Sequence, residues 1–379
     1  MATDDPALEL QEEIFDTAEQ ETEDERPPLS VPEKDRKLVT HPYDFIVRSL
    51  HDQIKDGTLM LADKFQRRRV WDDTKASRLI ESLLLNVPIP VCYFSEFDNS
   101  TYTVIDGQQR LTAIYRFLDN EFPLRGLRVR PDLNRKRFFE LSDADRRLIN
   151  SRSIRCIVLL KESHADIRFD VFERLNTGSV RLNAQELRNS MYRGALNDLL
   201  RDLSEFPSFQ QARGVTAVDK RMQDCELVLR FFAFHFRLQK YKGYFSTFLD
   251  EYLKYGMSFT PSQIDEHRAE FVKTITGAHG VFGGNAFRRR SKKGDWEGGV
   301  NRALYDCVML TFARIDLAEL KGKETELADA MGRLCADREF SDSVTFATKD
   351  KSKLQTRLRK FREALVGLGV STPELKVGV

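Results

Sequence analysis

The sequence lacks the features that mark membrane-spanning, secreted and zinc-binding proteins. No apolar run reaches the roughly 18–20 residues that a membrane-spanning helix needs. The amino end is acidic from Asp4 onward, which argues against a secretory or transit peptide. Cysteine is scarce, no two cysteines have the spacing of zinc ligands, and each lies in an apolar run: Cys92, Cys156, Cys225, Cys307 and Cys335. We therefore expect a cytoplasmic protein with buried, reduced thiols and no membrane partner.

Charge is unevenly distributed along the chain. Residues 1–33 contain twelve acidic side chains and one basic side chain, Arg26, which gives this segment a net charge of −11. Since the whole chain has a formal charge of +1, residues 34–379 carry +12. A basic body can bind a polyanion, and an acidic segment can compete for the same surface. The alternative is a solvated linker that only raises solubility.

The pattern of apolar residues predicts three regions and an α+β fold. Residues 1–38 are acidic and have little to bury, so we expect a flexible segment, in which Leu8, Leu10, Ile14 and Phe15 can form a short helix that docks on a partner. Residues 39–195 mix strands with helices. Ile46, Leu50 and Ile54 recur every four residues and predict a helix that ends near Gly57. Residues 196–379 are expected to be helical, except for a basic, glycine-rich loop at 277–299.

The segment with the clearest chemistry is Asp106-Gly107-Gln108-Gln109-Arg110, which follows an alternating strand pattern and precedes a helical one. A glycine at such a turn lets the backbone approach a ligand, and the amide groups of a helix start suit a phosphate. Arg110 can bind phosphate through two hydrogen bonds, Asp106 can hold Mg²⁺ or orient a water, and Gln108 and Gln109 can position a water or a ribose. The structural alternative is that Asp106 caps the helix with Gln109 as its partner.

Two other segments combine cations, amides and glycine. Phe65-Gln66-Arg67-Arg68-Arg69-Val70-Trp71 can grip phosphates and stack on a base, or it can be a basic turn anchored by its two aromatic residues. Phe172-Glu173-Arg174-Leu175-Asn176-Thr177-Gly178 is typical of a helix end with glycine after the cap.

Taken in order, these segments and Leu182-Asn183…Glu186-Leu187-Arg188-Asn189 resemble the amino-terminal domain of GmrSD-type (type IV) restriction enzymes and of phosphorothioate-sensing phage-defence effectors. The resemblance covers roughly residues 43–195. It implies a ParB/sulfiredoxin-like fold for this domain, followed by the all-helical domain. It also implies a nucleoside-triphosphate site in which nucleotide binding or hydrolysis is coupled to action on DNA.

Matched position by position, the resemblance implies a nucleotide site formed by Asp106, Gly107, Gln108, Gln109 and Arg110 and flanked by Gln66 and Arg67. Asn176 matches the asparagine of the downstream helix end, and Arg188 is expected to face the same cleft. Asp106, Gln108, Gln109 and Arg110 are the expected catalytic residues, and Asp106 is the expected Mg²⁺ ligand.

The sequence departs from the GmrSD pattern in its histidines. GmrSD-type enzymes carry a carboxy-terminal HNH nuclease domain, whose metal chemistry needs a general-base histidine with further ligands nearby. The six histidines are isolated from one another: His41, His51, His164, His235, His267 and His279. We therefore expect any DNA cleavage to come from a partner protein or nuclease subunit.

The carboxy-terminal half contains a candidate DNA contact in Arg288, Arg289, Arg290, Lys292 and Lys293, where flexible cations lie near aromatic residues. No helix-turn-helix, zinc-finger or RNP signature is present, so we expect no sequence-specific reading of DNA.

The leading hypothesis is a Mg²⁺-dependent NTPase subunit of a prokaryotic anti-phage or restriction system that acts on or senses DNA. A non-hydrolysing, nucleotide-gated DNA sensor or scaffold, and a DNA nickase with an unrecognised metal site, are the alternatives. The sequence leaves open the base of the nucleotide, the defence trigger and whether the protein forms a homo-oligomer.

Overall fold

The computed structural model describes Phe15 and residues 36–61, 71–97, 100–175, 183–219, 221–291 and 293–378. Contacts divide the chain into two compact units, one of residues 29–183 and one of residues 184–379 together with the segment that contains Phe15. The division between the units falls just before α7 (Ala184–Met191). We call them the sheet unit and the helical unit.

The sheet unit is built on five strands in the order β1-β5-β3-β4-β2. Strand β1 runs antiparallel to β5, β5 parallel to β3, β3 antiparallel to β4, and β4 parallel to β2. The elements along the chain are β1 (Thr40–Ile46), α2 (Val47–Asp56), β2 (Leu59–Met60), α3 (Asp73–Leu84), β3 (Cys92–Glu96), β4 (Tyr102–Asp106), α4 (Gln108–Leu118), η3 (Pro131–Leu133), η4 (Phe138–Glu140), α5 (Asp143–Ser151), β5 (Ser153–Leu159) and α6 (Ala165–Leu175).

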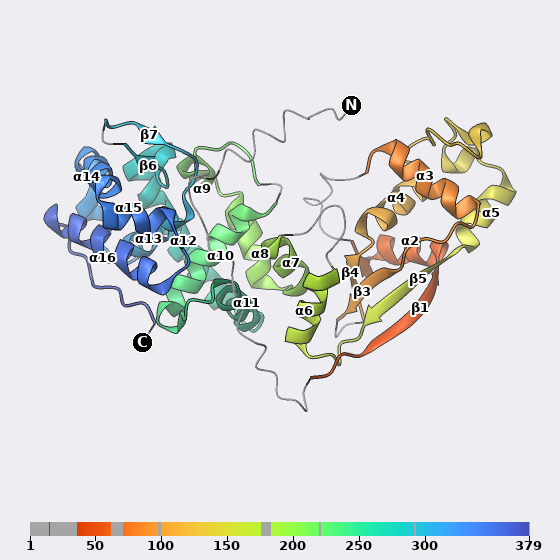
Figure 1. The fold of residues 1–379 in the computed structure, drawn as a ribbon, viewed down its shortest axis with the longest axis horizontal. Helices are drawn as coiled ribbons and strands as arrows, with labels where there is room; N and C mark the ends of the chain where they lie inside the picture. The colour runs from red at the N-terminus through yellow and green to blue at the C-terminus, as the bar shows by residue number, and fades with distance from the viewer. Residues whose placement is uncertain are drawn as a thin grey trace. The chain divides into compact units, whose positions relative to one another are not determined.

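The core of the sheet unit lies between the sheet and the helices gathered on one of its faces (Figure 1). Alternate residues of β3, Cys92 and Phe94, point into this core because side chains alternate between the two faces of a strand. Helix α4 contributes Leu111, Ile114 and Phe117, which recur at helical spacing and are buried. The strand-to-helix turn at 106–107 is therefore fixed at both ends by core packing.

The helical unit consists of α7 (Ala184–Met191), α8 (Ala195–Ser204), α9 (Pro207–Ala212), α10 (Gln223–Arg237), η5 (Leu238–Lys240), α11 (Phe245–Gly256), α12 (Pro261–Phe282), η6 (Gly283–Asn285), β6 (Arg289–Arg290), β7 (Trp296–Glu297), α13 (Arg302–Phe312), η7 (Leu317–Leu320), α14 (Glu324–Ala336), α15 (Arg338–Thr345) and α16 (Lys351–Gly367). Among the described residues, no helix is long and apolar enough to cross a membrane. The expected α+β fold, with helices following a mixed region, is confirmed.

A buried ionic network runs through the helical unit. Arg230 Nε and Nη2 donate to the two carboxylate oxygens of Asp306, at 3.0 and 2.7 Å. Arg357 Nη2 donates to the same carboxylate at 3.2 Å. All three side chains are almost completely buried, so each depends on the others to offset the cost of leaving water.

The structure adds one element to those expected and corrects another. Residues 40–46 form β1, because all seven residues pair with β5, and the expected helix follows as α2 and is capped by Gly57. The expected loop at 277–299 begins later, because α12 continues through Gly277 and Gly280 to Phe282. Most of the remaining segment is a short antiparallel hairpin in which Arg289 pairs with Glu297 and Arg290 with Trp296. We call residues 288–297 the basic hairpin.

Candidate functional site

The turn between β4 and α4 has the geometry that the sequence predicts. Strand β4 ends at Asp106, Gly107 follows with φ 99° and ψ 4°, and α4 begins at Gln108. This left-handed backbone conformation strongly favours glycine. Gly107 occupies the N-cap position, so no side chain caps the first turn of α4. The predicted alternative, in which Asp106 caps the helix, is therefore wrong.

Gly107 is also required by a close neighbour. A Cβ atom at this position would collide with the Cys92 Sγ atom and lie 3.0 Å from the Cys92 Cβ atom. It would also lie 3.5 Å from Arg110 Nη2. The backbone at this turn thus packs directly on β3, which no side chain larger than hydrogen would permit.

Asp106 and Arg110 form an ion pair within the turn. Arg110 Nη2 donates to Asp106 Oδ2 at 2.7 Å. Its Nη1 group donates to the carbonyl oxygens of Pro90 and, at 3.3 Å, Val91, just before β3. The Arg110 side chain is 12% exposed and that of Asp106 is 37% exposed, so the pair lies at the surface of the core with the carboxylate facing outward.

Gln109 connects the turn to a distant segment. Its Oε1 atom accepts a hydrogen bond from the Trp71 backbone amide at 3.0 Å. Trp71 is partly buried and packs against the core of the sheet unit. Gln109 therefore holds the chain where it returns from the segment that contains Gln66 and Arg67, both of which lie outside the described residues.

Two thiols lie behind the turn. Cys92 and Cys156 are paired in register on the parallel strands β3 and β5, and both are fully buried. The neighbouring Cys156 thiol lowers the pKa of Cys92, and the Arg110 guanidinium acts in the same direction against the effect of burial. The interaction with Cys92, together with burial, raises the pKa of Cys156. Nothing in the sequence pattern distinguishes Cys92 from an ordinary core cysteine, which is why its place beneath Gly107 was not predicted.

Arg188, predicted to face the nucleotide, belongs to the helical unit and is 1% exposed. Its Nε atom donates to Asp250 at 2.7 Å, and its Nη2 atom donates to the Ser246 hydroxyl at 2.7 Å. A third bond reaches Glu226 at 3.2 Å. These bonds give Arg188 a structural role in the helical unit, and its contact with a nucleotide stays a prediction. Asn176 lies outside the described residues.

The predicted DNA-binding cations lie on the basic hairpin, with Lys292 outside the described residues. Arg288, Arg289 and Arg290 are half-buried and Lys293 is exposed. Arg290 donates to Asp329 at 2.8 Å and to the Gly294 carbonyl at 3.0 Å, and its guanidinium lies 5.5 Å from the centre of the Trp296 ring. The sequence predicts a flexible loop here, but Arg289 and Arg290 lie on a strand that pairs with β7. A hollow of about 240 Å³ lies beside it, lined by Arg289, Arg290, Ser291, Glu297, Cys335 and Ala336.

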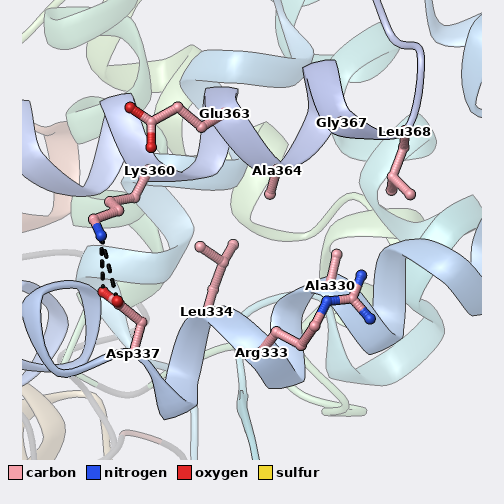
Figure 2. Close-up of a pocket in the computed structure, with 9 residues that line it drawn as sticks. All are labelled: Ala330, Arg333, Leu334, Asp337, Lys360, Glu363, Ala364, Gly367 and Leu368. Carbon is pink, nitrogen blue, oxygen red and sulfur yellow. Dashed lines mark hydrogen bonds and ion pairs between the residues drawn. The ribbon is translucent and has the colours of Figure 1, made fainter.

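A second hollow, of about 350 Å³, lies between α14 and α16 (Figure 2). Its floor is apolar, and Lys360 crosses one end to pair with Asp337 at 3.2 Å. Glu363 is paired with Arg359 at 2.9 Å. The lining has two cations, Arg333 and Lys360, and two acids, Asp337 and Glu363, so this hollow has no excess of positive charge to attract a phosphate.

The metal-binding capacity of the described residues is small. They contain no group of three or more histidine, cysteine or acidic side chains placed to share a metal ion. Asp106 is a single carboxylate at the turn, and Mg²⁺ is commonly held by one or two carboxylates with phosphate and water oxygens completing its shell. The turn therefore fits Mg²⁺ only together with a phosphate ligand.

Residues 47–193 match the family described as GmrSD restriction endonuclease, N-terminal domain. This part of the chain is thus similar to the amino-terminal domain of a restriction-type family. The match contains the turn at 106–110, the Gln109–Trp71 contact and α7, and it confirms the resemblance predicted from the sequence. A comparison with curated proteins found no match.

Proposed function

We propose that the GmrSD-type domain binds a nucleoside triphosphate at the β4–α4 turn and hydrolyses it with the help of Mg²⁺. The observation that carries this proposal is the glycine turn at Gly107, where an uncapped helix start lies beside Arg110 and Asp106. Helix amide groups and the helix dipole attract phosphate oxygens, and an arginine adds a charged, forked donor.

The ion pair in the turn supports a switch of partners on binding. Arg110 is bound to Asp106 and to two carbonyl oxygens. Phosphate oxygens can replace the Asp106 carboxylate as acceptors, which leaves that carboxylate available to a cation. Bound Mg²⁺ would neutralise charge on the triphosphate. Arg67 and Gln66 would then flank the phosphates, with Asn176 and Arg188 as further predicted contacts.

The two glutamines would have different tasks. The Gln109 side chain is held by the Trp71 amide through its oxygen, so its NH₂ group has a fixed position from which to donate. Gln108, the first residue of α4, would orient the attacking water. In this arrangement the residues bind and orient, as phosphoryl transfer requires of a protein.

At the level of the whole protein, we propose a cytoplasmic subunit of an anti-phage or restriction-type system. DNA would contact the basic hairpin through its phosphates, and a partner protein would supply nuclease activity. The similarity to a restriction-type family and the hairpin, in which Arg289 and Arg290 are paired and Arg288 and Lys293 are adjacent, support this proposal. Base preference and assembly into a homo-oligomer are left to experiment.

The test is phosphate release with each of the four ribonucleoside triphosphates, with and without duplex DNA and Mg²⁺. Arg110→Ala should abolish turnover. Arg116→Ala is a matched control, because Arg116 lies on the same helix but pairs with Asp73 and Glu121, away from the turn. Equal turnover in wild type and Arg110→Ala would remove the site assignment, provided that both variants unfold at similar temperatures.

Two outcomes would redirect the proposal. Saturable nucleotide binding without phosphate release would assign a nucleotide-gated DNA sensor. Mg²⁺-dependent plasmid nicking that survives Arg110→Ala would assign a nickase whose site is elsewhere.

A further inference from the structure

Phe15, in the acidic amino-terminal segment, is docked on the helical unit. Its backbone forms a parallel bridge with Val300, and its side chain is 8% exposed. The Arg302 guanidinium carbon lies 4.2 Å from the centre of the Phe15 ring, within range of a cation–π contact. An aromatic anchor therefore tethers the acidic segment to residues 300–302.

This anchor lies at the base of the basic hairpin. The amide of Asn301, next to Val300, donates to the Phe287 carbonyl at 2.8 Å, and Phe287 immediately precedes Arg288. Because the bridge is parallel, an extended continuation before Phe15 would run in the same direction as the residues before Val300. The residues that precede Val300 include β7, the second strand of the hairpin.

The charges of residues 1–14 and of the basic hairpin are complementary. Residues 1–14 contain Asp4, Asp5, Glu9, Glu12 and Glu13 and no lysine or arginine. The hairpin has five cations against Asp295 and Glu297, a net charge of +3. Trp296, which pairs with Arg290, precedes Val300 by four residues, and Gln11 precedes Phe15 by the same number. In an extended continuation of this bridge, Glu12 would come level with Glu297, the partner of Arg289, and Glu9 would come level with Gly294, next to Lys293.

We propose that residues 1–14 bind along the basic hairpin, so that the protein's own acidic segment occupies the surface that DNA phosphates would contact. The hollow lined by Arg289, Arg290 and Ser291 offers donors that suit a carboxylate and a phosphate oxygen equally well. Tethering at Phe15 keeps the local concentration of carboxylates in the millimolar range, so the competition is intramolecular. The binding of residues 1–14 to the hairpin does not depend on the proposed function. Its effect on the affinity for DNA does.

The first experiment tests occupancy without DNA. A carbodiimide joins carboxylates to lysine amines that touch them, and mass spectrometry of the full chain should find Glu9, Glu12 or Glu13 joined to Lys293. Phe15→Ala should reduce these crosslinks several-fold by releasing the anchor. Crosslinks absent from the wild type, or unchanged in Phe15→Ala, would overturn the proposal.

The second experiment measures affinity for a duplex of arbitrary sequence by fluorescence anisotropy. Neutralising the five acids of residues 1–14 (Asp4→Asn, Asp5→Asn, Glu9→Gln, Glu12→Gln, Glu13→Gln) should tighten binding about five-fold or more at low salt and much less at high salt, because salt screens the competing charges. The matched control neutralises five acids beyond Phe15 (Glu19→Gln, Glu21→Gln, Glu23→Gln, Asp24→Asn, Glu25→Gln) and should change affinity less than about two-fold. Equal effects of the two sets would refute directional docking. If no variant binds DNA while the crosslinks form, the proposed DNA contact fails and the docking stands.

Discussion

The side-chain oxygen of Gln109 accepts a hydrogen bond from the backbone amide of Trp71 at 3.0 Å. Gln109 belongs to the turn at 106–110, and Trp71 ends the segment that contains Gln66 and Arg67. The Trp71 ring is itself held in place by packing on the core and by the Lys75 ammonium group, 4.7 Å from its centre. One side chain thus connects the turn at 106–110 to a residue 38 positions earlier in the sequence.

Gln109→Ala should lower the free energy of unfolding of the sheet unit by about 1 kcal/mol, because the partly buried Trp71 amide loses its acceptor. Gln109→Glu keeps an acceptor oxygen and should stay close to wild type in stability. Urea denaturation followed by tryptophan fluorescence measures this difference. Equal stability of the two variants would show that water replaces the contact without cost.

Gly107→Ala should destabilise the sheet unit by about 2 kcal/mol or more, since the substitution combines a left-handed backbone with a collision at Cys92. Cys92→Ala in the same chain removes the sulfur and should recover the steric part of this loss. A double-mutant cycle gives the coupling energy between the two positions. Strict additivity of the two changes would mean that the backbone moves to avoid the sulfur.

Asp306→Ala should be among the most damaging changes in the helical unit, with a loss of about 3–5 kcal/mol, because it leaves Arg230 and Arg357 buried without their shared carboxylate. Asp329→Ala is the matched control, since Asp329 is 54% exposed and pairs with Arg290 at the surface. This second change should cost less than about 1 kcal/mol. Thermal and chemical denaturation of the two variants test the ranking.

The helical unit should lose stability in mild acid through His235. Burial, assisted by the Arg314 charge, lowers the pKa of His235 to about 4, whereas an unfolded histidine titrates near 6.5. The unfolded chain therefore takes up this proton first, so the contribution of His235 is complete above about pH 6.5 and is lost as the pH falls toward 4. The loss amounts to about 3 kcal/mol at most.

His235→Phe should make the acid loss shallower, because His235 stacks on Phe231 at a centroid distance of 5.2 Å and a phenyl ring fits the same stack. Denaturation between pH 7.5 and 4.5 compares the variant with the wild type. Both proteins contain His267, whose pKa is lowered by burial, and Asp224, whose pKa is raised by burial. The contributions of these two groups therefore cancel in the comparison. Parallel pH curves for the two proteins would exclude His235 as the cause.

The sequence predicted those parts of the fold that depend on local pattern. The strand, glycine and helix at 102–118 follow from alternation, a turn residue and helical spacing, and the structure places them as expected. Strand β1 was missed because its seven residues are defined by pairing with β5, more than one hundred residues later in the sequence. Pairing of this kind leaves no local signal.

The sequence singles out candidate residues of the site, but it does not indicate which groups these residues contact. Arg110 was expected to bind phosphate, yet its observed acceptors include the carbonyls of Pro90 and Val91, which no motif indicates. The contacts of Arg188 were still harder to predict, because its hydrogen-bond acceptors lie on α10 and α11, far along the chain. A buried arginine is recognisable only when its distant carboxylates are known.

The position of Arg188 decides how the protein can be dissected. The family match ends at residue 193 and so includes α7, but α7 is built into the helical unit. A fragment that ends at the family boundary would separate Arg188 from Asp250, Glu226 and Ser246 and leave its charge without these acceptors. Cutting after Asn183 keeps every one of these bonds in a single fragment, so that junction, rather than the end of the matched region, preserves the contacts of Arg188.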